Sequence, residues 1–406
     1  METGISVERA IALIEQNTYP VDTGVLRATK AHGRVLSEDI YAPMDQPPWP
    51  RSPLDGYALH AADSAGAGEA SPVSLPVVET LFAGSWTDRV VLPGEAVRLM
   101  TGAPIPQGCD CVIRQEDTDG GAQTVRLHKA LKPFENYVPA GGDFKAGDRL
   151  LPAGTRLTGN ALGVLAAAGL YREEILLPVY KPVRCAVICT GDELVPNDTR
   201  PLPPGKIYSS NAAVIASRLR DLGVEVTTLI PCFSDDADAL ADAIYEAAET
   251  ADAILTTGGV SVGAKDILHE TLPLLEPDRI FWQVRLKPGS PAMFSVYRGR
   301  PLLSLSGNPF AASATFELFA RPMLSRLCGC VDLKPRLTEG VLTEPFGKTS
   351  KGRRFVRAVY RDGQVSVPQG HSSGQLASAV GTNCLAEIPP STEPLAAESR
   401  VRVWLL

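Results

Sequence analysis

The sequence predicts a multidomain protein of α/β plus β structure. Its centre is expected to be a three-layer α/β domain, in which helices cover both faces of a parallel sheet. Three short apolar runs, at 183–190, 253–257 and 302–305, each end in a loop of Gly, carboxylate, hydroxyl and amide groups. Helix-patterned sequence separates these runs, and apolar strands that alternate with helices are typical of a sheet buried on both faces.

The length of the chain indicates several domains. A chain of 406 residues is too long for one hydrophobic core and suggests roughly two to four domains. We expect a mostly β N-terminal region at 1–178, with a β-rich insertion at about 46–150. The central α/β domain would occupy 179–329, and a small C-terminal β-barrel-like domain would occupy 330–406.

Charge and cysteine usage favour a cytoplasmic protein. The net charge of −7 argues against nucleic-acid and anionic-membrane partners. The N-terminus has no basic-then-apolar export signal, and no apolar run reaches the roughly 18 residues that a membrane span needs. The eight cysteines show no zinc-ligand spacing, so we expect buried free thiols in a reducing compartment.

The first half of the chain contains two expected helices and a region of short strands. A helix at 6–16 follows Ser6, a suitable N-cap. The proline-rich segment 44–58 predicts a rigid extended loop. Short strands and turns are expected from about 71 to 151, followed by a small-residue helix at 157–171.

In the central region, helices are expected at 209–222 and 235–250, and strands at 224–230 and 280–286. Pro309 suits the first turn of a further helix, which Pro322 is expected to kink or break.

From about 331 onward, short alternating strands predict the small β domain. This part also contains the basic run 348–357, which by itself is typical of a solvated loop.

Polar motifs in the N-terminal half are weak signals taken singly. The Asp55-Gly56 pair is a turn signal, and from this stretch alone we expect Asp55 only to cap its own turn. The strand before Thr101-Gly102-Ala103-Pro104 could lead to a phosphate site or to a simple turn. Asp143 lies in a second Gly-rich acidic turn.

The strand-end loops of the central region carry a stronger signal. Ligands of such sheets bind outside the carboxyl ends of the strands. The loops there supply carboxylates and lysines, namely Asp192, Glu193, Asp235, Asp236, Asp266, Lys265 and Lys287. Oxygen-rich, histidine-poor sites suit Mg²⁺, and Gly-rich turns let backbone N–H groups approach an anion. Together these features favour phosphate chemistry on a small anionic molecule.

Three common motifs do not explain these loops. No G-x-G-x-x-G follows a strand, and Leu342 stands where a P-loop ending at Thr349 needs its first Gly. Residues 259–263 fit the hydrolase pattern G-x-S-x-G around Ser261, but neither later histidine has a supporting pattern. A Gly-rich anion loop is the favoured interpretation.

The assembled motifs resemble those of the molybdopterin molybdenumtransferase family, called MoeA in bacteria and represented by the gephyrin E domain in animals. The likeness covers essentially the whole chain. Its motifs, each weak alone but occurring in the family's order and spacing, are Ser52–Ala58, Thr101–Pro104, Thr190–Leu194, Ser209–Asn211, Thr257–Gly263, Lys287–Gly289 and Gly307–Pro309.

The resemblance implies an elongated homodimer of four-domain chains with a composite active site, in which residues 1–178 form two interleaved domains. The implied reaction converts adenylylated molybdopterin and molybdate into molybdenum cofactor and AMP with the help of Mg²⁺. Asp55, Thr101 and Asp143 would reach the site from the other subunit, and Asp55 and Thr101 would act there with Glu193 and Asp266 as catalytic groups. Other proteins of cofactor biosynthesis are further candidate partners.

The resemblance also assigns residues to the metal and the substrates. Mg²⁺ would be held by Glu193, Asp235 or Asp236, and Asp266. Arg357 and Ser373 would help to hold the oxyanion. The remaining substrate-binding residues would be Gly258, Gly259, Ser261, Arg285, Lys287, Ser290, Asn308 and Pro309.

The chain departs from the family's pattern at a few positions. Many relatives have a second basic residue where Ser290 stands, Pro where Ser306 stands, and Ser where Ala311 stands. Arg51 replaces a common Asn. The alternatives are a molybdopterin adenylyltransferase or a CinA-type nucleotide pyrophosphatase, and a gephyrin-like scaffold that binds a peptide without catalysis.

Overall fold

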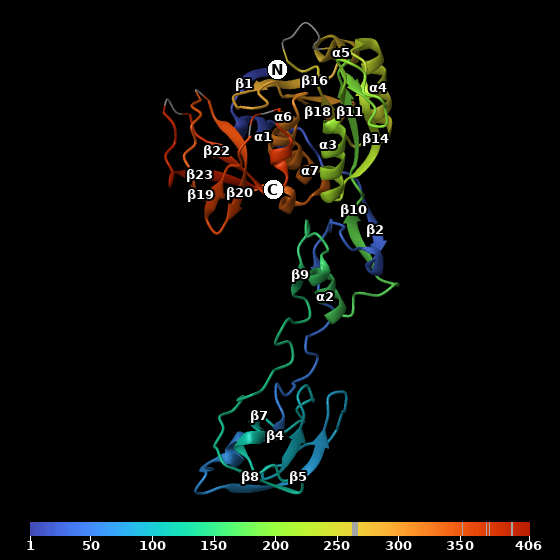
Figure 1. Cartoon of the computed structure of the whole chain (residues 1–406). Helices are drawn as coiled ribbons and strands as arrows, with labels where there is room; N and C mark the ends of the chain where they lie inside the picture. Colours follow the sequence, from blue (N-terminus) through green and yellow to red (C-terminus); the bar gives the residue numbers. More distant parts are fainter. Residues whose placement is uncertain (262–266, 351, 371, 373, 391–392) are drawn as a thin grey trace.

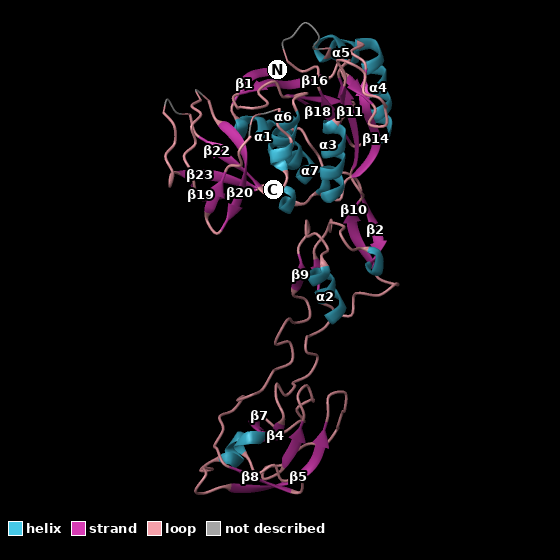
Figure 2. Ribbon diagram, in the orientation of Figure 1, coloured by secondary structure: helices cyan, strands magenta, loops and turns pink. Residues whose placement is uncertain are grey.

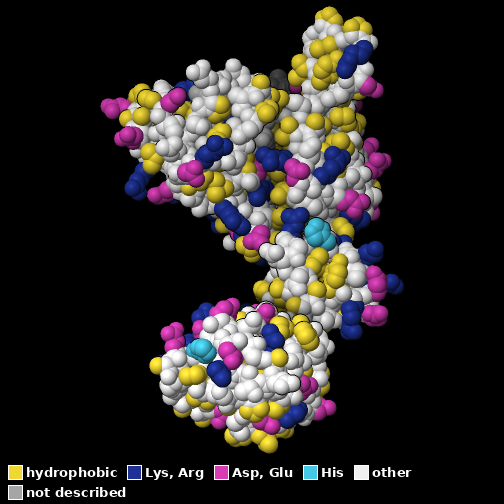
Figure 3. All heavy atoms as spheres, turned by 60° about the horizontal axis from the view of Figure 1, so that its bottom comes forward, with side chains coloured by type: hydrophobic (Ala, Val, Ile, Leu, Met, Phe, Trp, Pro, Cys, Tyr) yellow, Lys and Arg dark blue, Asp and Glu magenta, His cyan; other side chains and the backbone are white. Residues whose placement is uncertain are grey.

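The computed structural model describes all residues except 262–266, 351, 371, 373 and 391–392. The molecule is elongated (Figure 1). A mixed α/β body and a β-barrel lie side by side at one end, and a five-stranded sheet lies at the other end (Figure 2). The connection between them is narrow, as the space-filling view shows (Figure 3). Acidic and basic side chains are interspersed over the face in that view.

The α/β body is built on a seven-stranded sheet in the order β1-β16-β17-β18-β15-β11-β14. Every neighbouring pair is parallel except those that involve β17. The strands are β1 (Glu2–Ile5), β11 (Arg184–Thr190), β14 (Glu225–Phe233), β15 (Ala253–Thr257), β16 (Asp278–Val284), β17 (Met293–Tyr297) and β18 (Arg300–Leu305).

The predicted parallel sheet is present, and β17 is its one antiparallel strand among the described residues, which the sequence analysis did not anticipate. This strand and β18 form a hairpin through the two-residue turn Arg298-Gly299, and both turn residues have positive φ angles. Such turns match the twist of antiparallel strands. The sequence analysis treated 302–305 as an isolated strand and missed this turn.

Helices cover both faces of the sheet, as predicted. Alternate side chains of β11 enter two different hydrophobic cores, because successive strand residues point to opposite faces. Residues of α1 (Val7–Gln16), α3 (Ser210–Asp221), α6 (Pro309–Thr315) and α7 (Arg321–Cys328) line one core. Residues of α4 (Ala237–Thr250) and α5 (Leu268–Leu275) line the other.

The expected break near Pro322 takes a milder form. The chain stays helical from α6 to α7 through a π-helical segment, η4 (Phe316–Ala320). Proline lacks an N–H and crowds the carbonyl of the preceding turn, and a wider turn accommodates both effects. Pro322 lies in the first turn of α7.

The N-terminal region contains the predicted short strands. Two strand pairs, β2 with β10 and β3 with β9, lie with α2 between the body and the distal sheet (Figure 1). Their bounds are β2 (Thr23–Arg27), β3 (Ile40–Tyr41), β9 (Arg149–Leu151), α2 (Gly159–Ala167) and β10 (Leu176–Tyr180). The distal sheet has the order β7-β4-β6-β5-β8. Its strands are β4 (Gly56–Leu59), β5 (Val73–Leu81), β6 (Ala96–Leu99), β7 (Cys111–Arg114) and β8 (Thr124–Leu127).

The C-terminal strands close into the predicted barrel, in the order β19-β21-β20-β22-β23. They are β19 (Arg336–Leu342), β20 (Arg354–Arg361), β21 (Gln364–Ser366), β22 (Cys384–Ile388) and β23 (Arg400–Leu405). A further two-stranded ribbon, β12 (Leu194–Val195) with β13 (Ile207–Tyr208), follows β11.

The predicted free thiols are confirmed. All eight cysteines are free, and all but Cys232 and Cys328 are buried. Burial raises the pKa of Cys109 and of Cys328 to about 12, so these thiols stay protonated at neutral pH. Among the helices of the described residues, none has the length and apolar character to cross a membrane.

Candidate functional site

Three strand-end loops of the α/β body meet at one edge of the sheet. A Cβ atom built on Gly258, after β15, would lie 2.4 Å from the carbonyl oxygen of Thr190, at the end of β11. A Cβ atom on Gly307, after β18, would lie 3.3 Å from the Cα atom of Gly258. The amide of Asn211 donates to the carbonyl oxygen of Gly307 at 2.9 Å. The predicted convergence of these loops is therefore present.

Glycine is needed where these loops touch. Gly258 and Gly259 have φ angles of +96° and +60°, a region that residues with a Cβ atom rarely adopt. Beyond the third loop, Asn308 is the N-cap of α6, since its side chain accepts a hydrogen bond from the N–H of Ala311. Pro309 occupies the first turn of α6, as predicted.

Two side chains fix the loop that follows β15. The indole N–H of Trp282 donates to the carbonyl oxygen of Val260 at 3.1 Å. Nε2 of His269 lies 3.0 Å from the carbonyl oxygen of Ser261 and must carry the proton, because a carbonyl only accepts. The two rings are in edge contact, with centroids 4.7 Å apart. The sequence analysis missed both residues; Asp266, further along this loop, lies outside the described residues.

The carboxylates after β11 and β14 are held together by backbone contacts. The N–H of Asp192 donates to Oδ2 of Asp235 at 3.3 Å, and the N–H of Asp235 donates to Oδ1 of Asp192 at 3.1 Å. Asp236 is the N-cap of α4, and its side chain accepts from the N–H of Ala239. Glu193 is exposed beside Gly191.

These carboxylates suit Mg²⁺ in their chemistry, although the described residues form no group of three or more candidate ligands. Mg²⁺ usually takes one or two protein carboxylates and completes its shell with water and substrate phosphate oxygens. A pair of acidic loops at the sheet edge therefore fits a metal that the substrate helps to bind.

A basic pocket lies where the α/β body meets the barrel. The N–H of Lys287 donates to the carbonyl oxygen of Arg353 at 2.9 Å, and the N–H of Phe355 donates to the carbonyl oxygen of Lys287 at 2.7 Å. These bonds join the predicted K-P-G loop to the start of β20. A cavity of about 380 Å³ results, lined by Lys287, Pro288, Phe310, Lys348, Arg354, Phe355, Val356 and Ser372. Three of these side chains are basic and none is acidic, so the pocket suits an anion.

Arg357 lies against the wall of this pocket. Its side chain is 2% exposed, and its guanidinium carbon lies 4.4 Å from the ring centroid of Phe310. Nη2 donates to the carbonyl oxygen of Ser372 at 2.7 Å, whereas the buried Nε and Nη1 have no hydrogen-bond partner among the described residues. Burial lowers the pKa of Arg357. A buried cation with unpaired N–H groups calls for an explanation, and an anion in the pocket would supply one. Ser373, its predicted companion, lies outside the described residues.

Two predicted substrate residues lie on the loop that follows β16. The N–H of Arg285 donates to the carbonyl oxygen of Ile5, and the Arg285 side chain is exposed. The hydroxyl of Ser290 donates to the carbonyl oxygen of Val284 at 2.9 Å and so closes its own loop.

The N-terminal motifs form a second group. Oδ1 of Asp55 accepts hydrogen bonds from the N–H of Thr101 at 2.6 Å and from its hydroxyl at 2.7 Å. The expectation that Asp55 only caps its own turn was therefore wrong. The hydrogen bond from the Thr101 hydroxyl has the largest effect on the pKa of Asp55 and lowers it. The bond from the Thr101 N–H and the charge of Arg98 lower this pKa further.

The other N-terminal motifs run beside this pair. The N–H of Gly102 donates to the carbonyl oxygen of Ser52 at 2.8 Å. The N–H of Asp143 donates to the carbonyl oxygen of Gln46 at 2.9 Å. Segments around 46–55, 101–104 and 138–144 thus lie side by side, although the sequence places them far apart. Asp55 directly precedes β4 and Thr101 follows β6, so this second group borders the distal sheet, which lies at the other end of the molecule from the barrel (Figure 1).

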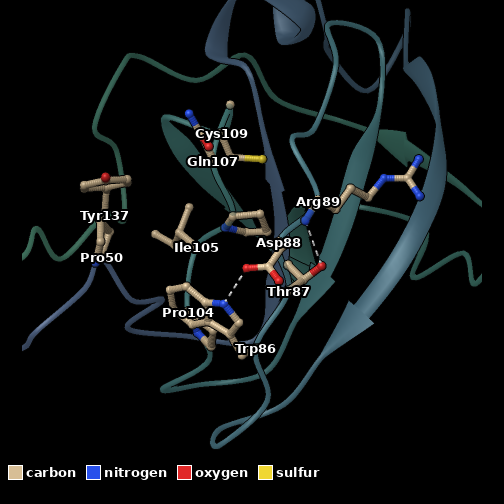
Figure 4. A pocket seen from close by; sticks show the side chains of 12 residues that line it. Pro50, Trp86, Thr87, Asp88, Arg89, Pro104, Ile105, Gln107, Cys109 and Tyr137 are labelled. Atoms are coloured by element: carbon tan, nitrogen blue, oxygen red, sulfur yellow. Dashed lines mark hydrogen bonds between the residues drawn. The ribbon is translucent and has the colours of Figure 1, made fainter.

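A separate cavity of about 500 Å³ opens beside Pro104, on the loop that follows Thr101 (Figure 4). Trp86, Ile105 and Tyr137 contribute to its lining, and the indole N–H of Trp86 donates to Oδ1 of Asp88 at 3.0 Å. Of its lining, Pro104 belongs to the predicted Thr101–Pro104 motif and Pro50 to the predicted extended loop, but the sequence analysis did not predict the cavity itself.

Comparison with known proteins identifies the family. Residues 5–169 match "MoeA N-terminal region (domain I and II)", residues 186–326 match "Probable molybdopterin binding domain", and residues 339–406 match "MoeA C-terminal region (domain IV)". A molybdopterin molybdenumtransferase of Staphylococcus aureus (strain COL) is 36% identical over 408 residues, covering 99% of this chain and 95% of that protein. One of Staphylococcus epidermidis (strain ATCC 35984) is 32% identical, covering 99% of this chain and 96% of that protein.

A solved structure agrees with the observed fold. The molybdopterin biosynthesis moeA protein from Pyrococcus horikoshii OT3 superposes with a TM-score of 0.85 at 26% sequence identity, covering 99% of this chain and 100% of that chain. The order of motifs, the fold and the relatives agree. The chain belongs to the MoeA family of molybdopterin molybdenumtransferases, enzymes of molybdenum cofactor biosynthesis.

Proposed function

We propose that this enzyme inserts molybdate into adenylylated molybdopterin and releases AMP. The observation that carries the proposal is the acid-free basic pocket with Arg357 buried at its wall. A small oxyanion would satisfy that charge, and the Gly258 and Gly307 loops suit the substrate phosphates. Cleavage of a phosphoanhydride between these two sites would leave AMP and a pterin next to the oxyanion.

In this proposal the chain's own groups bind and orient both substrates. Lys287, with Arg285 nearby on the same loop, neutralises substrate charge, and Arg357 holds the oxyanion with Ser373. Gly258, Gly259, Ser261, Asn308 and Pro309 form the surface on which the phosphates lie. Placing donors and cations where negative charge develops is the strongest catalytic contribution available to such a site.

Mg²⁺ would be held by Glu193 and Asp266, with Asp235 rather than the helix-capping Asp236 as the further carboxylate. When bound, the metal supplies Lewis-acid stabilisation of phosphoryl oxygens. Glu193 and Asp266 also position the water that attacks the phosphoanhydride.

We further propose that the active enzyme is a homodimer with composite sites. Asp55 directly precedes β4 and Thr101 follows β6 in the distal sheet, and Asp143 lies beside Gln46 on the connection to that sheet, so a partner subunit is the source from which they could reach a basic pocket. The ionised Asp55 would then help to position the water or the substrate.

The test is AMP release from adenylylated molybdopterin on addition of molybdate. We expect Lys287→Ala and Arg357→Lys to lower the rate, by about 10²–10³-fold where a positioned donor is lost. Glu193→Ala and Asp266→Ala should each abolish release while leaving the protein folded. Arg27→Ala removes an exposed arginine that is paired with Glu173. This control loses one positive charge, as Lys287→Ala does, and should release AMP at the wild-type rate.

Normal turnover in both the Glu193→Ala and Asp266→Ala variants would contradict the proposal. Incubation with ATP and molybdopterin separates the nearest alternative, since only an adenylyltransferase would form the adenylylated product. Recovery of an extended peptide ligand without any activity on the pterin nucleotide would favour a scaffold instead.

A further inference from the structure

The ring of Phe310 lines the basic pocket and lies close to the strand-end loops in sequence. Phe310 is the second residue of α6 and directly follows the Asn308-Pro309 motif. Its side chain is 4% exposed and lines the cavity. The start of α6 also leads directly from the Gly307 loop, which touches Gly258. One short segment therefore places both the strand-end loops and this ring.

The ring also packs against the guanidinium of Arg357. A distance of 4.4 Å from the guanidinium carbon to the ring centroid is well within the range of cation–π attraction. Among the described residues, the only hydrogen bond that this guanidinium makes is the one to Ser372, and no carboxylate pairs with it. A buried cation without a carboxylate partner is unfavourable unless other contacts hold it.

We propose that Phe310 is a positioning residue for the oxyanion substrate, because its ring holds the guanidinium of Arg357 at the wall of the basic pocket. The inference rests on the proposed function, in which Arg357 binds the oxyanion. Without the ring face, the guanidinium would lose its orientation, and affinity for the anion would fall while the phosphate site kept its geometry.

The experiment compares Phe310→Leu, Phe310→Tyr and Phe316→Leu in the full chain. Phe316 lies in the same hydrophobic core as Phe310, is 1% exposed, and directly follows α6 in the chain. The Phe316→Leu variant therefore controls for the loss of a buried ring from that core. Molybdate affinity is measured by titration calorimetry without the pterin substrate. The KM for molybdate, the KM for adenylylated molybdopterin and kcat are measured from AMP release.

We expect Phe310→Leu to weaken molybdate binding and raise its KM about 5- to 30-fold, the size of a desolvated cation–π contact. The KM for the pterin substrate and kcat should stay within about twofold of wild type. This pattern is expected when a variant weakens the binding of molybdate equally in the ground state and in the transition state. Phe310→Tyr keeps the ring face and should bind molybdate within about threefold of wild type. Phe316→Leu should lower the melting temperature and leave molybdate affinity unchanged.

A double mutant tests whether Phe310 acts through Arg357. Adding Phe310→Leu to Arg357→Lys should weaken molybdate binding no further than Arg357→Lys does, whereas independent effects would multiply. Multiplying effects, or equal molybdate affinity in Phe310→Leu and Phe316→Leu, would overturn the inference alone. If Phe310→Leu does not fold, Phe310→Met, which conserves volume without a ring, takes its place. A wild-type protein that binds no molybdate would instead refute the proposed function.

Discussion

The carboxylate of Asp55 has a long-range partner that its local sequence conceals. Asp-Gly pairs commonly form self-contained turns, in which the aspartate bonds to its own backbone. Here the carboxylate bonds instead to both donors of Thr101, on a different strand-end loop. A hydroxyl and an amide aimed at one oxygen favour the ionised form, and for this reason the pKa of Asp55 is lowered.

Thr101→Val should therefore raise the pKa of Asp55 toward its ordinary value. The variant removes the hydroxyl donor, which has the largest effect, and keeps the backbone N–H. The stability that these bonds contribute is present above the unfolded-state pKa of the carboxyl and is lost as pH falls through its lower folded-state pKa. Titration of the carboxyl by NMR in wild type and variant checks this, and an unchanged pKa would show that the hydroxyl bond is not formed in solution.

Residue types and spacing were enough to indicate most of the candidate site. Lys287, Gly258, Gly307 and Asn308 were predicted, and the structure places their loops at the sheet edge or beside the basic pocket. His269 and Trp282 were missed because their role is to hold backbone carbonyls, which requires no particular motif. Ser290 was noted as a departure, and the structure shows that its hydroxyl bonds to its own loop.

At the scale of elements, the start of α4 separates two adjacent aspartates. Asp236 caps the helix, whereas Asp235 bonds to the loop that follows β11. An N-cap is equally well served by Asn, whereas a Mg²⁺ ligand needs the charge of a carboxylate.

Asp236→Asn should accordingly leave both stability and Mg²⁺ requirement near wild type, and Asp235→Asn should raise the Mg²⁺ concentration needed for half-maximal AMP release. Asp236→Ala should cost about 0.5–2 kcal/mol of stability through the lost cap. Magnesium titrations and denaturant unfolding of the three variants provide the measurements. A raised Mg²⁺ requirement in Asp236→Asn alone would instead assign the metal to Asp236.

The elements themselves followed their local patterns closely. The apolar run of β11 became a strand whose alternate residues enter two cores, and the 209–222 and 235–250 helices formed within about two residues of expectation. The exception was β17, whose direction depends on the Arg298-Gly299 turn. A strand's periodicity reports its burial but not its direction, so only the turn residues could have indicated the hairpin.

At the scale of the whole molecule, the two groups of polar motifs lie at opposite ends of an elongated chain (Figure 1). In the proposed homodimer, the polar loops of the N-terminal half would serve the site of the partner subunit. A second copy of the chain, related by twofold symmetry, would bring the distal end of one protomer to the basic pocket of the other.

Mixing two inactive variants tests this arrangement. In a composite dimer of Asp55→Asn and Lys287→Ala chains, one site carries both changes and the other carries neither. Random exchange of subunits makes half of the dimers mixed, so activity should recover to about one quarter of wild type. Recovery of AMP release after subunits are dissociated and reassociated is the measurement. No recovery, with mixed dimers shown to form, would place both residues in the site of one chain.

The sequence by itself determined most of the elements, the β character of the C-terminal domain and the family, because strand and helix periodicity, caps and ordered motifs can be read along the chain. Only the tertiary structure decided that Asp55 meets Thr101, that Arg357 packs on Phe310 and that Lys287 pairs with the start of β20. Each of these contacts joins elements far apart in sequence. Their geometry depends on how strands and helices pack against one another, which no local pattern encodes.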